Sequence, residues 1–478
     1  MSRRFKISGS AFYVDVMSDS QEVTGSCLYC TVHFPDNEST HFIVDCGLFQ
    51  ESEYNDLNNE LLFDPSKVDF ALITHNHIDH IGRLPFLVKN GFNSPIYTTV
   101  DTCTLLPLAL NDTSSILRGR AKKTKNPPLY TDTDVSKTIN LVNGIPYGAE
   151  ISMSKNIKCT FFPNGHLFGA ALILVQIEYY GFDPINILFM GDYNNKNMFF
   201  DVPPLPDWVL NLPLTIVCES TYGYMDSSEI FPCFVNNILT FFENNPNGTL
   251  ILPVFSLGRS QEMLKTLKIL QDEKRLPDVP IYLDGKLTLR YTKLIINNHL
   301  VSVPVEKNDI LPYNLQNVCK DSRLPLLTDK YGKIIVSSSG MGSYGPVQCY
   351  IQHYLKRQDA LIHFTGYCAE NTLGRRLYDA KENDFVNFAG LLIQKKAAVK
   401  FTNEFSAHAK SDELIEFLQQ FKQLTLVCIT HGQTQVKENF SKKVSQEVET
   451  ENVGILSRDY FFRIKPKGDI TTLPTHFI

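Results

Sequence analysis

The chain has 478 residues, more than one hydrophobic core usually serves, so its length predicts two or three domains. Hydrophobic residues make up 43% and charged residues 20%, which provides a sizeable core and excludes wholesale disorder. The formal net charge of −6 gives no sign of a polyanion-binding protein as a whole, so any such site must be local.

The eleven cysteines are scattered along the chain. Cys27 and Cys30 are the one close pair, and residues three apart in a strand point to opposite faces, so they are poorly placed to share a metal. Buried free thiols in a reducing compartment are expected. Residues 1–5 contain two arginines with no apolar run behind them, and no stretch approaches the roughly 20 apolar residues of a membrane span. We therefore expect a cytoplasmic protein, or a nuclear one if the source is eukaryotic, with no membrane partner.

The first two hundred residues are predicted to be rich in strands joined by tight turns. Residues 26–34 and 41–44 carry the strand pattern. Residues 68–74 and 185–190 are short apolar runs that predict buried strands. A further run covers residues 159–162.

From about residue 215 the pattern changes to strands that alternate with helices. The predicted strands are residues 215–218, 249–255, 281–283, 333–337 and 360–364. Between the second and third, a helix places Met263, Leu264, Leu267 and Leu270 on one face. Such alternation favours a parallel α/β sheet. After about residue 393 one helix (412–421) and one strand (425–430) follow, which suits an α/β domain inserted into another domain.

Directly after the 68–74 strand comes the hexapeptide His75-Asn76-His77-Ile78-Asp79-His80. Three imidazoles and a carboxylate in six residues form a group of borderline ligands suited to Zn²⁺. The alternative is a polar loop that happens to be rich in histidine. The chain has only twelve histidines, and three of them in one hexapeptide argue against that alternative.

Further ligands are expected at other strand ends, because a catalytic metal site is assembled from several loops. His166 follows the 159–162 run, Asp192 follows the 185–190 strand, and His431 follows the 425–430 strand. Each signal is weak alone, since a lone histidine at a strand end is more often structural. Together with the hexapeptide they form a pattern.

With these motifs in order, the sequence resembles the metallo-β-lactamase superfamily, and within it the β-CASP branch of RNA-processing nucleases. Asp45 in IVDCG matches the first motif, THNHIDH the second, His166 the third and Asp192 the fourth. Glu219 in ESTYG, His408 in FSAHA and His431 in THGQ match motifs A, B and C of the branch. Three segments look like its inserted domain: PVFSLGRSQE, SSSGMGSYGP and GYCAENTLGRR.

The resemblance implies an α/β fold, in which an αββα metallo-β-lactamase sandwich carries an inserted α/β β-CASP domain. Residues 1–222 would form the first part of the sandwich and residues 223–393 the insert. Residues 394–478 would form the second part of the sandwich with motifs B and C.

The resemblance also implies metal ligands and a cofactor of two Zn²⁺ per chain. His75, His77 and His166 would hold one ion. Asp79, His80 and His431 would hold the other, and Asp192 would bridge them. Such a pair clamps an in-line displacement and lowers the pKa of a shared water, which would attack phosphorus as hydroxide.

Asp45, Asp79, Glu219 and His408 are the expected catalytic residues. Asp45 resembles a carboxylate that orients a ligating histidine, although it could be a turn aspartate before Gly47. Glu219 would orient His408, whose other nitrogen donates to the scissile phosphate or the leaving oxygen. A Ser–His cap at a helix start would explain FSAH by itself.

Candidate phosphate-binding residues lie elsewhere. Ser337, Ser338, Ser339 and Gly340 end a predicted strand, where backbone N–H groups can cradle a phosphate, but an ordinary loop fits equally well. Arg259, Arg375 and Arg376 are candidates for RNA phosphate contacts, although surface arginines are common. Residues 118–125 (RGRAKKTK) hold five basic residues in eight. A solvated loop is the favoured interpretation of this segment and an RNA-guiding patch the sharper one.

The expected function is a zinc-dependent ribonuclease, endonucleolytic with 5′ exonucleolytic action as a second mode, with RNA as its partner and a homodimer as its candidate assembly. A DNA nuclease of the same branch is the nearest alternative, but such members typically replace the motif C histidine by an apolar residue. A dead scaffold subunit would lose metal ligands, and a small-molecule metallo-hydrolase would lack the inserted domain.

Overall fold

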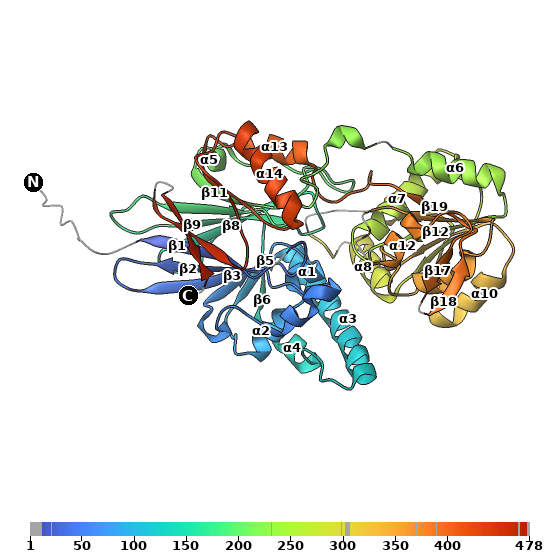
Figure 1. Ribbon diagram of the computed structural model, residues 1–478, viewed down its shortest axis with the longest axis horizontal. Helices are drawn as coiled ribbons and strands as arrows, with labels where there is room; N and C mark the ends of the chain where they lie inside the picture. The colour runs from blue at the N-terminus through green and yellow to red at the C-terminus, as the bar shows by residue number, and fades with distance from the viewer. Residues whose placement is uncertain are drawn as a thin grey trace, which may run out of the picture. The chain divides into compact units, whose positions relative to one another are not determined.

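The structure is a computed structural model that describes residues 12–475, apart from Gln21, Phe231, Asn298, 302–305, Tyr367, 369–370, Ala389 and 467–468. Residues 1–5, where no signal was expected, and part of the GYCAENTLGRR segment lie outside the described residues. The chain divides into two compact units (Figure 1). Unit 1 comprises Met1–Ser227 and His408–Ile478, and unit 2 is Ser228–Ala407. Within the described residues, no helix is both long enough and apolar enough to span a membrane.

Two sheets form the centre of unit 1. The first has the order β23 (Ile470–Pro474), β22 (Tyr460–Ile464), β1 (Tyr13–Ser18), β2 (Leu28–His33), β3 (Ser39–Val44), β4 (Phe70–Leu72), β5 (Ile96–Thr99) and β6 (Val142–Ile145). The second has the order β21 (Val453–Ile455), β20 (Gln423–Ile429), β11 (Pro213–Cys218), β10 (Ile185–Phe189), β9 (Ala171–Ile177), β8 (Ile157–Pro163) and β7 (Glu150–Ser152). The two sheets share one hydrophobic core.

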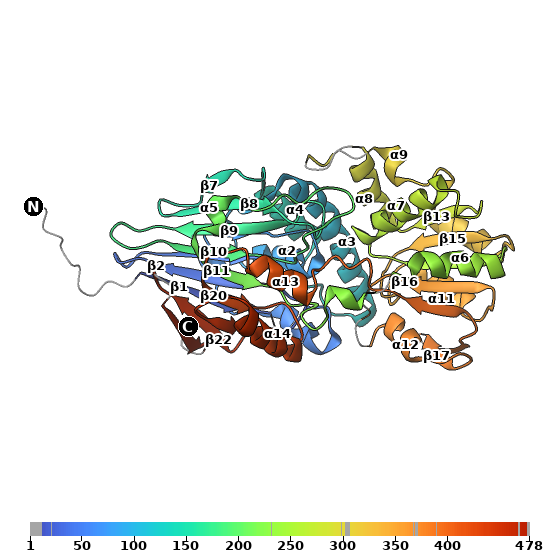
Figure 2. The same cartoon turned by 90° about the horizontal axis from the view of Figure 1, so that it is seen from above.

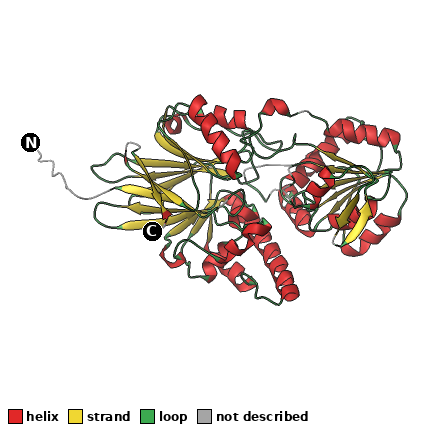
Figure 3. Ribbon diagram, in the orientation of Figure 1, coloured by secondary structure: helices red, strands yellow, loops and turns green. Residues whose placement is uncertain are grey.

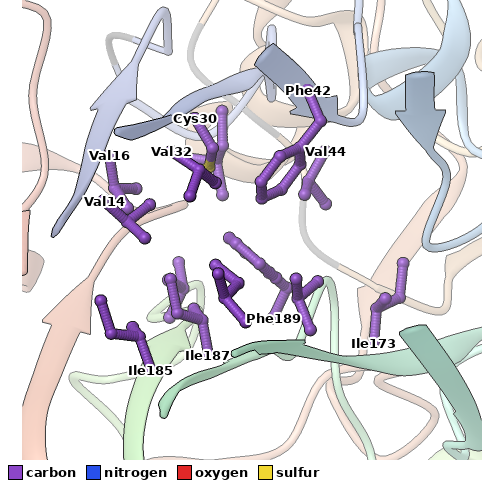
Figure 4. Packing of buried hydrophobic residues seen from close by; sticks show 14 of the residues in the cluster. Val14, Val16, Cys30, Val32, Phe42, Val44, Ile173, Ile185, Ile187 and Phe189 are labelled. Carbon is purple, nitrogen blue, oxygen red and sulfur yellow. The ribbon is translucent and has the colours of Figure 1, made fainter. Parts of the chain in front are cut away.

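Alternating side chains of both sheets fill this core, as the period of two in a strand requires. Val14, Val16 and Val32 of the first sheet face Ile185 and Ile187 of the second (Figure 4). Cys30 lies in the same core, and all eleven cysteines are free thiols.

Helices cover the outer faces of the two sheets (Figure 3). Helices α13 (Ser411–Leu418) and α14 (Thr434–Glu447) pack on the second sheet, with Phe417 and Phe440 beside Leu188 and Ile216. On the opposite side lie α1 (Ile78–Ile81), α2 (Leu84–Lys89), α3 (Val100–Thr124) and α4 (Asp132–Leu141). Shorter helices are η1 (Ser52–Asn59), η2 (Pro65–Lys67), α5 (Asp207–Leu210) and η3 (Ser227–Glu229). The predicted αββα sandwich is confirmed.

Unit 2 contains a parallel sheet with the order β14 (Leu315–Val318), β13 (Ile281–Asp284), β15 (Lys333–Ser337), β12 (Thr249–Pro253), β16 (Ala360–Phe364) and β19 (Ala398–Phe401). Its helices, several of them labelled in Figure 2, are α6 (Phe234–Asn244), α7 (Arg259–Asp272), α8 (Lys286–Ile296), α9 (Lys307–Ile310), η4 (Lys320–Ser322), α10 (Arg323–Thr328), α11 (Val347–Tyr354) and α12 (Leu373–Asp379). Strands β17 (Phe385–Phe388) and β18 (Leu391–Gln394) form an antiparallel pair. Helix α7 buries the four apolar residues predicted to share one face. The expected parallel α/β sheet is therefore present.

Unit 2 differs in extent from the expected insert at residues 223–393. It runs from Ser228 to Ala407, because β19 pairs in parallel with β16 and completes the sheet. The sequence of β19, AVKF, is too short and too mixed in polarity to predict a strand.

The basic segment at residues 118–125 also differs from the favoured interpretation of a loop. Residues 118–124 form the last turns of helix α3, and Lys125 ends it in a left-handed conformation. Arginine, lysine and alanine are strong helix formers, so propensity extends the helix through this cluster of like charges.

Candidate metal centre

The seven residues predicted to hold metals meet at strand ends of the two sheets in unit 1. His75 and His77 follow β4, and Asp79 and His80 lie in the short helix α1. His166 follows β8, Asp192 follows β10 and His431 follows β20. These side chains form two groups of converging ligand atoms.

The first group brings together His75, His77, His166 and Asp192. His77 Nδ1 lies 3.1 Å from His75 Nε2 and 3.0 Å from His166 Nε2. Asp192 Oδ2 lies 3.5 Å from Nε2 of both His75 and His166. Three imidazole nitrogens and one carboxylate oxygen therefore face one point.

The second group contains Asp79, His80 and His431. His80 Nε2 lies 3.2 Å from His431 Nε2, which is 3.9 Å from Asp79 Oδ2. Asp192 Oδ1 lies 3.1 Å from His80 Nε2 and 3.3 Å from His431 Nε2. Asp192 thus presents one oxygen to each group, which is the arrangement of a bridging carboxylate.

The donor set fits divalent cations. Imidazole and carboxylate are ligands of borderline metal ions. Five of the seven residues are buried, and His77 and Asp79 are partly exposed. Asp192 Oδ1 is buried, and although it lies 3.1 Å from His80 Nε2, no described residue donates a well-aligned hydrogen bond to it. A buried anionic oxygen without a donor is costly unless a cation faces it.

The protonation states of the first group suit metal binding. Burial lowers the pKa of His75 well below its usual value and that of His77 to about 4, so both rings keep a free lone pair. Burial raises the pKa of Asp192, but the surrounding imidazoles, His431 and His80 first, lower it well below the usual range. Neutral imidazoles and an ionised carboxylate are the forms that bind metals.

In the second group, burial raises the pKa of Asp79, but a hydrogen bond from His431 and the charge of His80 lower it to about 2. Burial lowers the pKa of His80, whereas the charges of Asp192 and Asp45 raise it well above its usual value. This ring would release its proton when a cation binds, so metal uptake is coupled to proton release.

Asp45 fixes the orientation of His80. Its Oδ1 accepts the Thr74 N–H at 2.8 Å, and its Oδ2 accepts the Thr74 hydroxyl at 2.7 Å. The same Oδ2 lies 2.7 Å from His80 Nδ1, which leaves Nε2 facing Asp192. Asp45 has φ of 62°, and a Cβ on Gly47 would come within 1.5 Å of the Asp79 carbonyl oxygen. A left-handed backbone is rare for residues other than glycine, and the side-chain contacts of Asp45 with Thr74 and His80 stabilise it here.

Glu219 and His408 form a pair beside the two groups. His408 Nδ1 lies 2.9 Å from Glu219 Oε2, and its Nε2 lies 3.8 Å from Asp192 Oδ2. Burial lowers the pKa of His408, but Glu219 and Asp192 raise it above the usual value. The side chain of His408 is 19% exposed, whereas that of Glu219 is 1% exposed. The ring can therefore reach a bound molecule while the carboxylate holds it from behind.

Models of known protein families match most residues of both units. A model of the "Metallo-beta-lactamase superfamily" matches residues 26–147, and one of the "Beta-Casp domain" matches residues 260–377. The chain therefore carries a metallo-β-lactamase domain and a β-CASP domain. A third model, described as a "Zn-dependent metallo-hydrolase RNA specificity domain", matches residues 393–455.

Relatives of this β-CASP protein align along most of its length. Ribonuclease TTHA0252 of Thermus thermophilus is 29% identical over 435 residues, which cover 87% of this chain and 91% of the relative. RNase aCSPSF2 of Saccharolobus solfataricus is 27% identical over 452 residues, covering 94% and 84%. Transcription termination factor FttA of Methanosarcina mazei is 27% identical over 434 residues, covering 86% of this chain but 65% of that protein.

Three further polar residues of the β-CASP protein, which the sequence did not single out, contact residues of the candidate centre. Thr74 binds Asp45, and the Thr221 hydroxyl lies 3.0 Å from His431 Nδ1. Asn164 donates to the Asp192 carbonyl at 3.0 Å and accepts the His166 N–H at 2.9 Å. Thr74 and Thr221 stand inside the THNHIDH and ESTYG motifs, and Asn164 stands two residues before His166, so their positions were the available signal.

The predicted phosphate-binding loop lies in unit 2 and is largely engaged in its own fold. Ser337 is buried. The Ser338 N–H donates to the Asp284 carbonyl and the Ser339 N–H to the Tyr344 carbonyl, both at 3.3 Å. Two of the expected phosphate donors are thus already used, which leaves Gly340 as the candidate backbone donor of the four.

Arginine side chains predicted to contact RNA are likewise engaged. Arg259 is 9% exposed and donates to the Thr365 carbonyl at 2.6 Å, so its main contact is structural. Arg375 pairs with Asp379 at 3.0 Å, and Arg376 donates to the Asn371 carbonyl at 2.9 Å.

Proposed function

We propose that this chain is a ribonuclease that hydrolyses RNA phosphodiester bonds with two Zn²⁺ held by the two ligand groups of unit 1. The observation that carries the proposal is the two-sided contact of Asp192, whose Oδ2 faces one group and whose Oδ1 faces the other. A pair of cations in these groups would supply a lowered pKa for water and charge stabilisation of an in-line displacement.

The chain's own residues would divide the remaining work. His75, His77 and His166 would hold one ion, and Asp79, His80 and His431 would hold the other. Asp45 keeps His80 in the tautomer that turns Nε2 toward Asp192. His408 holds a proton at Nε2, and Glu219 keeps that nitrogen directed at the site through Nδ1. We assign His408 as the general acid that protonates the leaving 3′ oxygen.

RNA is the proposed substrate because three features favour it over DNA. The segment 393–455 matches a family model described as an RNA specificity domain, and relatives named as ribonucleases align over most of both chains. The motif C position is also a histidine, His431, whereas DNA nucleases of the branch typically have an apolar residue there. His431 Nε2 lies 3.3 Å from Asp192 Oδ1.

Incubation of zinc-loaded protein with end-labelled RNA and DNA of matched sequence tests the proposal. We expect RNA to be cleaved and the DNA to remain intact, with all cleavage lost in chelator. Internal fragments would indicate endonucleolytic action and a mononucleotide ladder from the 5′ end exonucleolytic action. Cleavage of DNA alone would favour the DNA nuclease, and cleavage of neither would reject the nuclease proposal.

Metal content is a separate prediction. Purified protein should hold about two Zn²⁺ per chain, because seven ligands exceed the four of one tetrahedral site. Elemental analysis of a folded sample prepared without chelator measures this number. One ion or none, with no further uptake on titration, would contradict the dinuclear centre.

A further inference from the structure

Helix α3 ends in a dense group of exposed cations. Arg118, Arg120, Lys122, Lys123 and Lys125 are all exposed. Lys122, Lys123 and Lys125 form no ion pair with any residue that the structure describes. In a chain with a net charge of −6, this group forms a local positive surface.

The end of α3 extends beyond its packing. The buried residues of this helix end at Ser114, whose hydroxyl donates to Asp132 of α4 at 2.7 Å. Arg118 pairs with the same carboxylate, and no residue of α3 after Ser114 is buried. Residues 115–124 therefore add about 15 Å of helix that core packing does not require. Figure 1 shows α3 with α4 at the lower margin of unit 1.

The other end of α3 is attached to the metal centre. The hydroxyls of Thr99 and Thr102 donate to the Gly169 carbonyl at 2.7 and 2.9 Å, in the loop that carries His166. Helix α3 also packs against α1, which contains Asp79 and His80. The 25 residues of α3 place its charged end about 37 Å from this attachment. At 3.4 Å per nucleotide, a stacked strand spans that distance in about 11 nucleotides.

Stabilisation of helix α3 explains only some of these five positive charges. Cations in the last turn favour the negative end of the helix dipole, which suits Lys122 and Lys123. Five cations in eight residues exceed that need, and neighbouring like charges at helical spacing repel one another. A bound polyanion would relieve that repulsion.

We propose that the exposed end of α3 is an RNA-docking surface that binds the phosphate backbone of the substrate at a distance from the cleaved bond. The inference rests on the proposed ribonuclease function. The ammonium groups of exposed lysines bind phosphates through charge and do not recognise bases. We therefore expect the contact to be independent of RNA sequence and sensitive to salt.

The test compares two variants with the same change in charge. In the docking variant, Lys122, Lys123 and Lys125 are replaced by Gln. In the control, Gln replaces three exposed lysines elsewhere in unit 1: Lys67, Lys155 and Lys442. Both are made in the zinc-loaded full chain carrying His408→Ala, which slows cleavage while affinity is measured. Fluorescence anisotropy then gives the Kd for single-stranded RNAs of about 20 and about 5 nucleotides, chosen to be longer and shorter than the span of α3.

We expect the docking variant to bind the long RNA about 10- to 100-fold more weakly at 0.1 M salt, because three phosphates are no longer neutralised. Its slope of log affinity against log salt should fall by about 2, since each neutralised phosphate of a single strand contributes about 0.7 to that slope. The short RNA and the control variant should show the parent affinity. Replacement of the same three lysines by Arg should retain binding, because the charge is kept.

Equal slopes in the docking and control variants would overturn the proposal, and so would equal losses of affinity for long and short RNA. Weaker binding by the arginine variant would also overturn a surface based on charge alone. Failure of the proposed function is read separately, as an absence of RNA cleavage by the chain with His408 intact.

Discussion

Asp192→Asn is expected to lower kcat/KM for RNA cleavage by at least about 10⁴-fold, because the variant weakens both ligand groups at once. Each carboxylate oxygen faces a different pair of imidazole nitrogens, at 3.1 to 3.5 Å. An amide has nearly the same shape but carries no charge and turns its NH₂ toward one of the two groups. No single substitution among the other ligands affects both sides in this way.

The control is Asp201→Asn, the same chemical change at an exposed position of the same unit. Cleavage rates and bound metal are measured for both variants by single-turnover assays and elemental analysis. Asp192→Asn should hold less metal than the parent, whereas Asp201→Asn should match the parent in both respects. Near-normal cleavage by Asp192→Asn would mean that the carboxylate does not bridge the groups, and the proposed centre would then be wrong.

The sequence predicted which side chains meet at this candidate centre because metal chemistry restricts the residue types so strongly. His75, His77, Asp79 and His80 stand together in one hexapeptide, and each remaining candidate directly follows a recognisable strand. Strand ends at one edge of a sheet meet in space, so separate weak signals converge on one place. The parallel sheet of unit 2 was predictable for a similar reason, since buried parallel strands are short apolar runs between helices.

Other features depend on contacts that no local pattern encodes. The left-handed backbone of Asp45 and of His431, with φ of 62° and 50°, is stabilised by distant partners. The orientation of His431 depends on Thr221, which arrives from a different strand end. The Ser337–Gly340 loop looked open to a phosphate, yet carbonyls of Asp284 and Tyr344 take two of its N–H groups. Strand β19 became a strand only because β16 pairs with it.

His408→Ala is expected to reduce the rate of RNA cleavage by roughly 10²- to 10⁴-fold, the range of a missing general acid, while both ligand groups keep their metal. His408 faces Asp192 at 3.8 Å and Glu219 at 2.9 Å, and both carboxylates raise its pKa. Because the acid form is the active one, the rate of the parent enzyme should fall as pH rises through the pKa of His408. That alkaline decline should be absent from the pH profile of His408→Ala. The control is His33→Ala, since His33 also faces a carboxylate, Asp15 at 3.5 Å, in a pair outside the centre.

A substrate with sulphur in place of the bridging 3′ oxygen separates proton transfer from phosphate binding. A thiolate leaves without needing a proton, so a variant that lacks only the general acid should recover most of its rate on this substrate. His408→Ala should therefore be rescued, whereas Asp192→Asn should not, because its defect lies in the ligand groups and precedes departure of the leaving group. If His408→Ala stays slow on the sulphur substrate, the ring binds the scissile phosphate without giving up a proton. Glu219 would then keep the His408 ring protonated, so that its positive charge stabilises the phosphate. The proton for the 3′ oxygen would have to come from water.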